Sequence, residues 1–341
     1  MRLGFDGRVF RHAAVTGVER YARELYNHLG MLTKLELFLP QATSRYGQHL
    51  WVQTGLPYAA RRAKLDVLFC PVMAAPLWLD RRIKLVVTVQ DLMCFRFPEM
   101  YSWAFRNYYR VLIPLVIRRA DRILTLTQAE RENIISLYPF ADEKVEAIHL
   151  GVADRFVWEK CAREQVILAV GSTNKHKNLS GLLRAFALIA DQIPHQLVIV
   201  GGGRSIISSD DSIDEILRFL PAGRVTLTGY VSDDELAGWY NRADFFVFPS
   251  FFEGFGLPPI EAMACGCPVI VSNCSCLPEV CGDSASYCNP DDPADIARAM
   301  LTLARDPDEK DRLREKGLRH AMKFGWRRCA ELTLEAIRGT V

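Results

Sequence analysis

The 341-residue chain has no apolar run long enough to span a membrane, and its first residues, MRLGFDGR, lack the apolar core of a signal peptide. Its formal net charge is only +2, which argues against general binding to nucleic acid. From these absences we expect a protein that stays in the cytoplasm and has no nucleic-acid partner.

The ten cysteines lack the C-x2-C spacing and the nearby histidines of common zinc sites. Two C-x-C pairs occur, Cys265 with Cys267 and Cys274 with Cys276. A chain of this size has a core that needs no disulfides, so we expect reduced and mostly buried thiols. The only D-x-D, at residues 306–308, lies between two polar helical segments and is expected to be a helix-capping turn and not a metal site.

Charge is distributed unevenly between the two halves of the chain. Residues 1–160 contain 23 lysines and arginines against 16 acidic residues, whereas residues 161–341 contain 19 against 24. A basic first half predicts an anionic partner on that side. Two partners fit this pattern, a phosphate-bearing acceptor and a negatively charged membrane surface, to which the protein would bind peripherally.

Short apolar runs alternate with helical stretches along the chain, which predicts an α/β fold with parallel sheets in two domains. The strands expected in the first domain are residues 2–5, 35–39, 65–70, 85–89, 123–127 and 145–150. The strands expected in the second domain are residues 166–170, 197–200, 225–230, 245–248, 268–272 and 286–288. Residues 152–164 show no period and are predicted to connect the domains.

The most informative stretch is residues 243–273, which has the pattern of a strand, a loop, a short helix and a second strand. Gly254 and Gly256 allow a sharp turn and a close approach of the backbone to a ligand. Pro258 and Pro259 suit the first turn of the helix that follows. A glycine loop that leads from a parallel strand into a helix N-terminus is a typical phosphate site.

Two glutamates flank this loop, with seven residues between them. Glu253 lies just before the turn, and Glu261 is expected in the first helical turn. Carboxylates repel phosphate, so these two are better suited to accept hydrogen bonds from sugar hydroxyls. The alternative is that Glu261 only complements the helix dipole and that Glu253 is a solvated loop charge.

The segment EGFGLPPIEAMACG, residues 253–266, resembles the E-x7-E region of glycosyltransferase family 4, a retaining group with the GT-B fold that uses nucleotide sugars. The resemblance implies that Glu253 contacts the donor sugar and Glu261 the ribose. It assigns contacts with the sugar and the diphosphate to the backbone of four residues, Gly254, Phe255, Gly256 and Leu257.

The GT-B resemblance also implies a domain plan, in which two Rossmann-like parallel-sheet domains face a central cleft. Residues 1–160 would form the N-terminal acceptor-binding domain, and residues 161–320 the nucleotide-sugar-binding domain. Residues 321–341 would carry a final helix that crosses back onto the N-terminal domain. No metal ion and no other cofactor is implied.

The loop GSTNKHKNL, residues 171–179, matches the family loop that supplies cations to the donor phosphates. Lys177 aligns with the lysine of that loop. The family often has an arginine at one of two neighbouring positions, where this chain has Ser172 and His176, so Lys175 or His176 would share the cationic role.

Two later strand ends contribute further candidates for the donor site. Arg204, in the turn after residues 197–200, is a second candidate for the phosphates. Tyr230 belongs to a turn that packs beside the nucleotide base in the family. The glycine run at residues 201–203 lacks the G-x-G-x-x-G register, which weakens a dinucleotide interpretation.

In the first domain, TGVERYARELYNHL resembles the family's glycine loop and helix, which makes Gly17 a candidate for a backbone contact with the donor diphosphate or the acceptor. By itself Gly17 is equally an ordinary glycine at a helix start. After residues 85–89 the family commonly has a His-Asp pair, where this chain has Gln90 and Asp91. Glutamine forms hydrogen bonds but cannot act as a base. Asp91 is either the charged group near the acceptor hydroxyl or a cap for the next segment.

The stretch YSWAFRNYYRVLIPLVIRR, residues 101–119, mixes aromatic and basic side chains. It fits an acceptor-facing or membrane-facing helix. It fits a core helix with snorkelling arginines better, because residues 112–117 are apolar on all sides and Pro114 interrupts them.

From the residues and the resemblance together we expect an enzyme that transfers a hexosyl group from a nucleotide diphosphate sugar to a hydroxyl, with retention of configuration. The chain resembles bacterial mannosyl- and rhamnosyltransferases of surface-polysaccharide assembly, which favours GDP-mannose as the donor and a glycan or lipid-linked acceptor. The catalytic candidates are Glu253, Lys177, Asp91 and Gln90. The alternatives are a UDP-hexose donor and a non-catalytic scaffold that binds nucleotide sugars.

Overall fold

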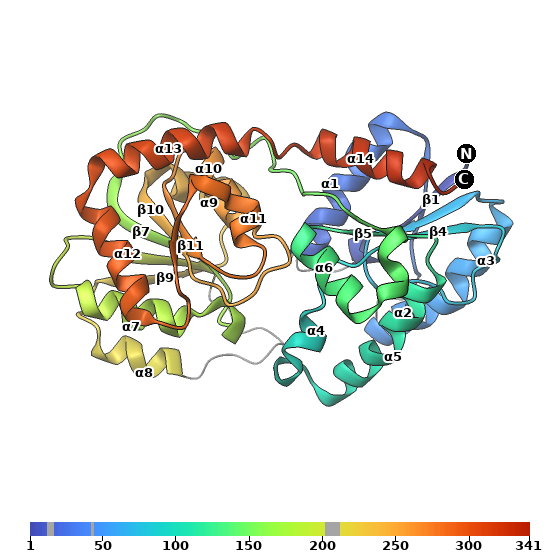
Figure 1. The fold of residues 1–341 in the computed structure, drawn as a ribbon, viewed down its shortest axis with the longest axis horizontal. Helices are drawn as coiled ribbons and strands as arrows, with labels where there is room; N and C mark the ends of the chain where they lie inside the picture. The colour runs from blue at the N-terminus through green and yellow to red at the C-terminus, as the bar shows by residue number, and fades with distance from the viewer. Residues whose placement is uncertain (12–16, 42–43, 202–211) are drawn as a thin grey trace. The chain divides into compact units, whose positions relative to one another are not determined.

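The computed structural model describes residues 1–11, 17–41, 44–201 and 212–341. The chain divides into two compact units, one of residues 1–151 together with 325–341 and one of residues 152–324. Each unit contains a six-stranded sheet whose pairings in the described residues are all parallel (Figure 1). The predicted α/β class with two parallel sheets is therefore confirmed.

The sheet of the first unit has the order β2-β1-β3-β4-β5-β6. Its strands are β1 (Leu3–Asp6), β2 (Leu35–Phe38), β3 (Val67–Cys70), β4 (Lys84–Thr88), β5 (Arg122–Thr125) and β6 (Val145–Ala147). Its helices are α1 (Gly17–Leu32), α2 (Arg45–Gln53), α3 (Gly55–Arg62), α4 (Met93–Arg96), α5 (Trp103–Arg119), α6 (Gln128–Leu137) and α14 (Trp326–Arg338).

Both faces of this sheet are covered, which explains why the central strands β3 and β4 are mostly apolar and buried. In β3, Leu68 and Cys70 belong to a core cluster with α3 and α5, whereas Phe69 packs on Phe5 of β1 with ring centroids 5.5 Å apart. The C-terminal helix α14 packs on α1, and the Tyr21 ring lies 6.4 Å from that of Trp326 (Figure 1). The last helix of the chain thus belongs to the first unit.

The second unit has the strand order β12-β11-β10-β7-β8-β9. Its strands are β7 (Glu164–Gly171), β8 (Gln196–Gly201), β9 (Val225–Gly229), β10 (Ala243–Phe248), β11 (Val269–Ser272) and β12 (Ser286–Cys288). Its helices are α7 (Leu179–Ile189), α8 (Ser212–Phe219), α9 (Asp233–Arg242), α10 (Leu257–Ala264), α11 (Leu277–Cys281), α12 (Pro293–Arg305) and α13 (Pro307–Ala321).

Helices cover this second sheet on both faces as well. Helix α7 packs against α8 and α12, and α10 packs against α9, α11 and α13 (Figure 1). Ser232 caps α9 through the predicted capping box with Glu235. The ten cysteines are all free thiols, and eight of them are buried.

Helix α5 combines the two interpretations of residues 101–119. Its buried residues are Leu112, Ile113, Val116 and Ile117, so one side belongs to the core as predicted. The other side is solvent-exposed and includes Val111 and Leu115, at 65% and 46% exposure. The prediction of a core helix therefore holds for one side of α5 only. Among the described residues, no helix is both long and apolar enough to cross a bilayer.

Candidate active site

The order in which strands are added to the sheet of the second unit reverses between β7 and β10. The chain begins at β7, adds β8 and β9 on one side, and then returns to place β10 on the other side of β7. In doubly wound sheets, the loops at the carboxyl ends of the two strands that flank this point form a ligand-binding crevice. Here those two loops contain Lys177 and Glu253.

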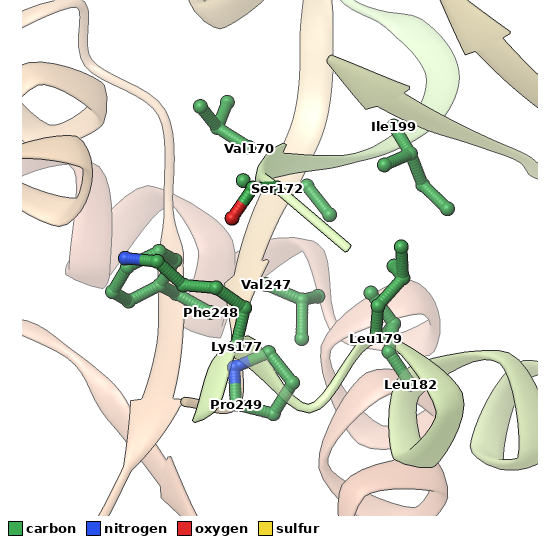
Figure 2. Close-up of a pocket in the computed structure, with 11 residues that line it drawn as sticks. Val170, Ser172, Lys177, Leu179, Leu182, Ile199, Val247, Phe248 and Pro249 are labelled. Carbon is green, nitrogen blue, oxygen red and sulfur yellow. The ribbon is translucent and has the colours of Figure 1, made fainter. Parts of the chain in front are cut away.

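The side chains of Lys177 and Glu253 form an ion pair at this point. Lys177 Nζ lies 2.8 Å from Oε1 and 2.9 Å from Oε2 of Glu253. The same ammonium group lies 5.2 Å from the centroid of the Phe248 ring at the end of β10 (Figure 2). The side chains are only 22% and 11% exposed, so the pair is poorly solvated. The sequence analysis assigned the two residues to the same site, and the fold brings them into contact.

The loop that contains Glu253 is held in place by its neighbours. Phe251 N donates to the backbone oxygen of His176 at 2.8 Å, which links the β10 loop to the β7 loop. Ser275 Oγ accepts from Glu253 N at 3.2 Å and donates to Glu253 O at 2.9 Å. The backbone on both sides of the Glu253 carboxylate is therefore fixed before any ligand binds.

The loop enters α10 at Gly256, whose φ of +92° suits glycine better than any other residue. Glu261 was predicted in the first helical turn. It is the fifth residue of α10 and lies in the second turn. It is only 4% exposed, and Tyr240 Oη donates to its Oε2 at 3.4 Å. Glu261 is thus a buried, hydrogen-bonded carboxylate, and its contact with the ribose stays a prediction.

His176 is buried directly behind the ion pair. Burial, and secondly the charge of Lys177, lower the pKa of the His176 ring to about 4. The ring is therefore neutral at pH 7, and its Nδ1 has no hydrogen-bond partner among the described residues. Without a ligand the ring therefore carries no charge, and a share of His176 in the cationic role stays a prediction. Lys175, in contrast, is exposed.

A small apolar cavity lies beneath Lys177 in the second unit (Figure 2). Its volume of about 20 Å³ is enough for roughly one water molecule. The residues that line it include Val170, Ser172, Leu179, Ile199 and Val247. A nucleotide sugar is far too large for this space, so the donor cannot bind inside the cavity. The cavity lies next to Lys177, below the proposed donor site.

The other candidates of the second unit have different surroundings. Phe255 is 3% exposed, whereas Gly254 and Leu257 are half-buried. Tyr230, after β9, is 82% exposed and available for contacts with a ligand. Arg204 lies outside the described residues.

In the first unit, Gln90 and Asp91 directly follow β4. Gln90 is 7% exposed, and its Nε2 donates over a long 3.5 Å to Pro71 O at the end of β3. Asp91 Oδ1 accepts from Met93 N at 3.0 Å, as a cap of the next segment would. Gly17 is the exposed first residue of α1, and its Cα has open space around it.

Two charged groups that were not predicted from the sequence lie at the same edge of the first sheet. Arg8, after β1, is 5% exposed, and its Nε lies 3.3 Å from Oδ2 of the fully buried Asp6. Glu130, after β5, is 1% exposed, and its pKa is raised to about 7 by burial and by the charge of Asp91. The sequence signal was present in both cases, since each residue lies within five positions of the end of an apolar strand run.

Both units of the chain resemble known protein families. The family model "Glycosyl transferases group 1" matches residues 164–306, and the model "Glycosyltransferase Family 4" matches residues 30–156. O-antigen chain mannosyltransferase B of Escherichia coli is 27% identical over 95% of this chain and 96% of that protein.

Two solved structures show the same fold across almost the whole chain. Sucrose-phosphate synthase from Thermosynechococcus elongatus has a TM-score of 0.81 at 20% identity, with 99% of this chain and 98% of that chain covered. Anabaena HepE, solved in complex with UDP-glucose, has a TM-score of 0.76 at 17% identity, with 99% and 100% covered. The two family models account for most of both units, and both neighbours share the fold, so the chain is a glycosyltransferase of family 4 with the GT-B fold.

Proposed function

We propose that this glycosyltransferase moves a mannosyl or similar hexosyl group from a nucleotide diphosphate sugar, preferably GDP-mannose, to a hydroxyl of a glycan or lipid-linked acceptor in surface-polysaccharide synthesis, with retention at the anomeric carbon. The observation that carries the proposal is the Lys177–Glu253 ion pair at the switch point of the second sheet. It combines a cation for phosphate with a carboxylate for sugar hydroxyls, on two loops that the fold brings together.

The proposed roles follow from charge. When the bond between the anomeric carbon and the donor phosphate breaks, negative charge grows on the leaving diphosphate. Lys177 and the backbone N–H groups at the start of α10 stabilise that charge. Glu253 accepts hydrogen bonds from the transferred sugar, and Glu261 accepts them from the ribose.

Retention requires the acceptor to attack from the face on which the diphosphate leaves. The acceptor oxygen forms the new bond to the anomeric carbon, and its proton passes to an oxygen of the departing phosphate. This route needs no protein base, which suits a chain with Gln90 at the end of β4. Asp91 then serves the acceptor by hydrogen bonding.

The choice of GDP-mannose draws on the similarity to the Escherichia coli mannosyltransferase over nearly the full length of both chains. A UDP-hexose is the alternative, and the complex of HepE with UDP-glucose favours it. The base itself is left open by the described residues, because Tyr230 would stack on guanine and uracil alike.

The direct test is thermal stabilisation by GDP and by UDP, followed by turnover. A ligand at one hundred times its dissociation constant stabilises the folded state by about 2.7 kcal/mol. We expect GDP to raise the melting temperature of the wild type and of Lys323→Ala, an exposed lysine of the second unit, and to raise that of Lys177→Ala and Glu261→Ala much less. GDP release from GDP-mannose that depends on an added mannoside would establish transfer. Nucleotide binding without any such release, from GDP-mannose or from UDP-hexoses, would instead support the scaffold.

Peripheral contact with a membrane is supported by one surface of the first unit, which we call the α2–α5 surface. Its exposed apolar side chains are Tyr46 and Leu50 on α2 and Tyr108, Val111 and Leu115 on α5. The two helices meet where the His49 and Tyr108 rings lie 5.1 Å apart. Helix α5 has no acidic residue and exposes Arg110 and Arg118, so its charge complements anionic lipid.

Vesicle sedimentation tests this contact. We expect the protein to sediment with phosphatidylglycerol vesicles and less with phosphatidylcholine vesicles. The double variant Val111→Asp and Leu115→Asp should stay in the supernatant, and Leu188→Asp, on an exposed position of the second unit, should bind like the wild type. Equal binding of all three proteins would exclude the α2–α5 surface.

A further inference from the structure

Two carboxyl groups lie on neighbouring loops at the carboxyl edge of the first sheet. Asp91 directly follows Val89 and Gln90 after β4, and Glu130 lies in the first turn of α6, after β5. Strands β4 and β5 are adjacent and parallel, with Thr88 paired to Leu124. The fold therefore brings the Asp91 loop against the N-terminus of α6.

Both carboxyl oxygens of Glu130 are engaged inside the protein. Oε2 accepts from Leu92 N at 3.2 Å, and Oε1 accepts from Asn133 Nδ2 at 2.9 Å. The backbone of Glu130 is fixed in turn, because Thr127 Oγ1 accepts from its N–H at 3.2 Å. Leu92 is the residue after Asp91, so the Glu130 carboxylate holds the turn that presents Asp91.

We propose that Glu130 is a positioning residue for the acceptor side of the reaction, which acts by holding the Asp91–Leu92 turn through its ionised carboxylate. The proposal rests on the proposed transfer to an acceptor hydroxyl and adds a residue to it. Glu130 itself is only 1% exposed, so we assign it a positioning role and not a contact with the substrate.

The chemistry of a carboxyl group explains why ionisation matters. A carboxylate offers only acceptors, which matches the two donors that face Glu130. Protonation places a hydrogen on one oxygen, and that oxygen then opposes an N–H group. One of the two hydrogen bonds must weaken, and the other loses its charge assistance.

Glu130 also changes charge near neutral pH. Burial, and secondly Asp91, raise its pKa to about 7, while the hydrogen bonds from Asn133 and Leu92 and the charge of Arg96 on α4 lower it by less. Burial raises the pKa of Cys94 to about 12 and raises that of Tyr101 and Tyr138 above the ordinary tyrosine value. These three groups therefore stay neutral while Glu130 titrates.

The test compares Glu130→Gln with Glu132→Gln, the same change at an exposed position of the same helix. Glutamine resembles the protonated acid, with one acceptor and one donor group. One charge-assisted hydrogen bond makes the ionised form about tenfold better. Since the ionised fraction rises from about one tenth at pH 6 to nine tenths at pH 8, we expect kcat/KM of the wild type for the acceptor, with saturating donor, to rise about fivefold. For Glu130→Gln, kcat/KM for the acceptor should stay at the pH 6 value of the wild type at all pH values, with the donor KM unchanged. Glu132→Gln should show the same pH profile as the wild type.

Amide hydrogen exchange provides a readout that needs no substrate. Protection of the Leu92 amide, corrected for the intrinsic pH dependence, should increase from pH 6 to pH 8 in the wild type and stay constant in Glu130→Gln. If the wild type transfers no sugar from any donor, the proposed function fails. Hydrogen exchange of the Leu92 amide then tests whether Glu130 holds the turn. The proposal would be overturned if kcat/KM of Glu130→Gln and of the wild type changed with pH in the same way. It would also be overturned if protection of the Leu92 amide in the wild type did not change between pH 6 and pH 8.

Discussion

The ion pair between Lys177 and Glu253 leads to an unusual expectation for the variant Glu253→Gln. In the ligand-free chain the ammonium group is already bound by a carboxylate, at 2.8 and 2.9 Å. A nucleoside diphosphate must compete with that carboxylate for Lys177. Glu253→Gln removes the competing charge and keeps the size of the side chain, so we expect it to bind GDP more tightly and to transfer sugar more slowly.

The size of the gain follows from two opposing effects. Opposite charges about 4 Å apart attract by roughly 4 kcal/mol at an effective dielectric constant of 20. Desolvation offsets most of this, because the two side chains are only 22% and 11% exposed. Hydrogen bonds to charged groups contribute a net of about 1.5 to 3 kcal/mol. Loss of even the lower amount would tighten GDP binding about tenfold. Transfer should fall about a hundredfold, because the sugar loses a charged hydrogen-bond partner.

Isothermal titration of GDP at low salt measures the first effect, and initial rates with GDP-mannose measure the second. The decisive control is the same substitution in a Lys177→Ala background. If Glu253 acts by occupying Lys177, Glu253→Gln should improve GDP binding only when Lys177 is present. If the carboxylate merely repels phosphate, the gain will be the same in both backgrounds.

Two results would refute this interpretation of the site. The first is weaker or unchanged GDP binding by Glu253→Gln, since the ion pair would then not compete with the nucleotide. The second is an equal gain with and without Lys177. In either case the contact in the ligand-free chain would be a structural bond, and the cation for the phosphates would have to be found elsewhere.

Three further predictions concern pH and backbone. Burial raises the pKa of Glu130 to about 7, so the folded state favours the neutral form. The free energy of unfolding of the wild type should therefore fall by up to about 3 kcal/mol as the pH rises from about 4.5 through 7. Urea unfolding should show Glu130→Gln to be more stable than the wild type at pH 8 and equally stable at pH 4.5. Since the pKa of His176 is about 4, His176→Gln should bind GDP like the wild type at pH 6 in titration calorimetry, whereas a change of affinity there would mean that the ring is charged. Gly256→Ala should lower stability by about 1 to 2 kcal/mol because its φ is +92°, while Gly17→Ala, with open space around it, should melt like the wild type.

The fold was predictable from the sequence because its signals are local. The runs at residues 166–170, 197–200 and 245–248 are continuous apolar segments, and parallel sheets covered on both faces require such segments. The capping box at Ser232 and the glycine turn at Gly256 are equally local. Helix α5 was misjudged on its exposed side because Val111 and Leu115 are apolar, and composition does not reveal which apolar side of a helix lies outside.

The residues of the candidate site could be predicted from the sequence, but their ion pairing and protonation states could not. The sequence indicates Lys177 and Glu253 separately, whereas their pairing depends on β7 and β10 being neighbours. The neutrality of His176 depends on burial against residues far along the chain, such as Phe251, whose N–H binds the backbone oxygen of His176. The position of Glu130 after the β5 run was visible in the sequence, but its pKa depends on a contact with a loop 38 positions earlier and was not.

These charge states suggest where the pH dependence of the enzyme originates. Ser172 and Gln90 carry no charge, and His176 is neutral above its pKa of about 4. The described residues near Lys177 and Glu253 therefore include no group with a pKa shifted into the range between pH 6 and 8. Glu130 in the first unit does titrate in that range. Catalytic pH dependence between pH 6 and 8 should accordingly appear in the kinetics of the acceptor, while the affinity for nucleotide follows the ionisation of the nucleotide itself.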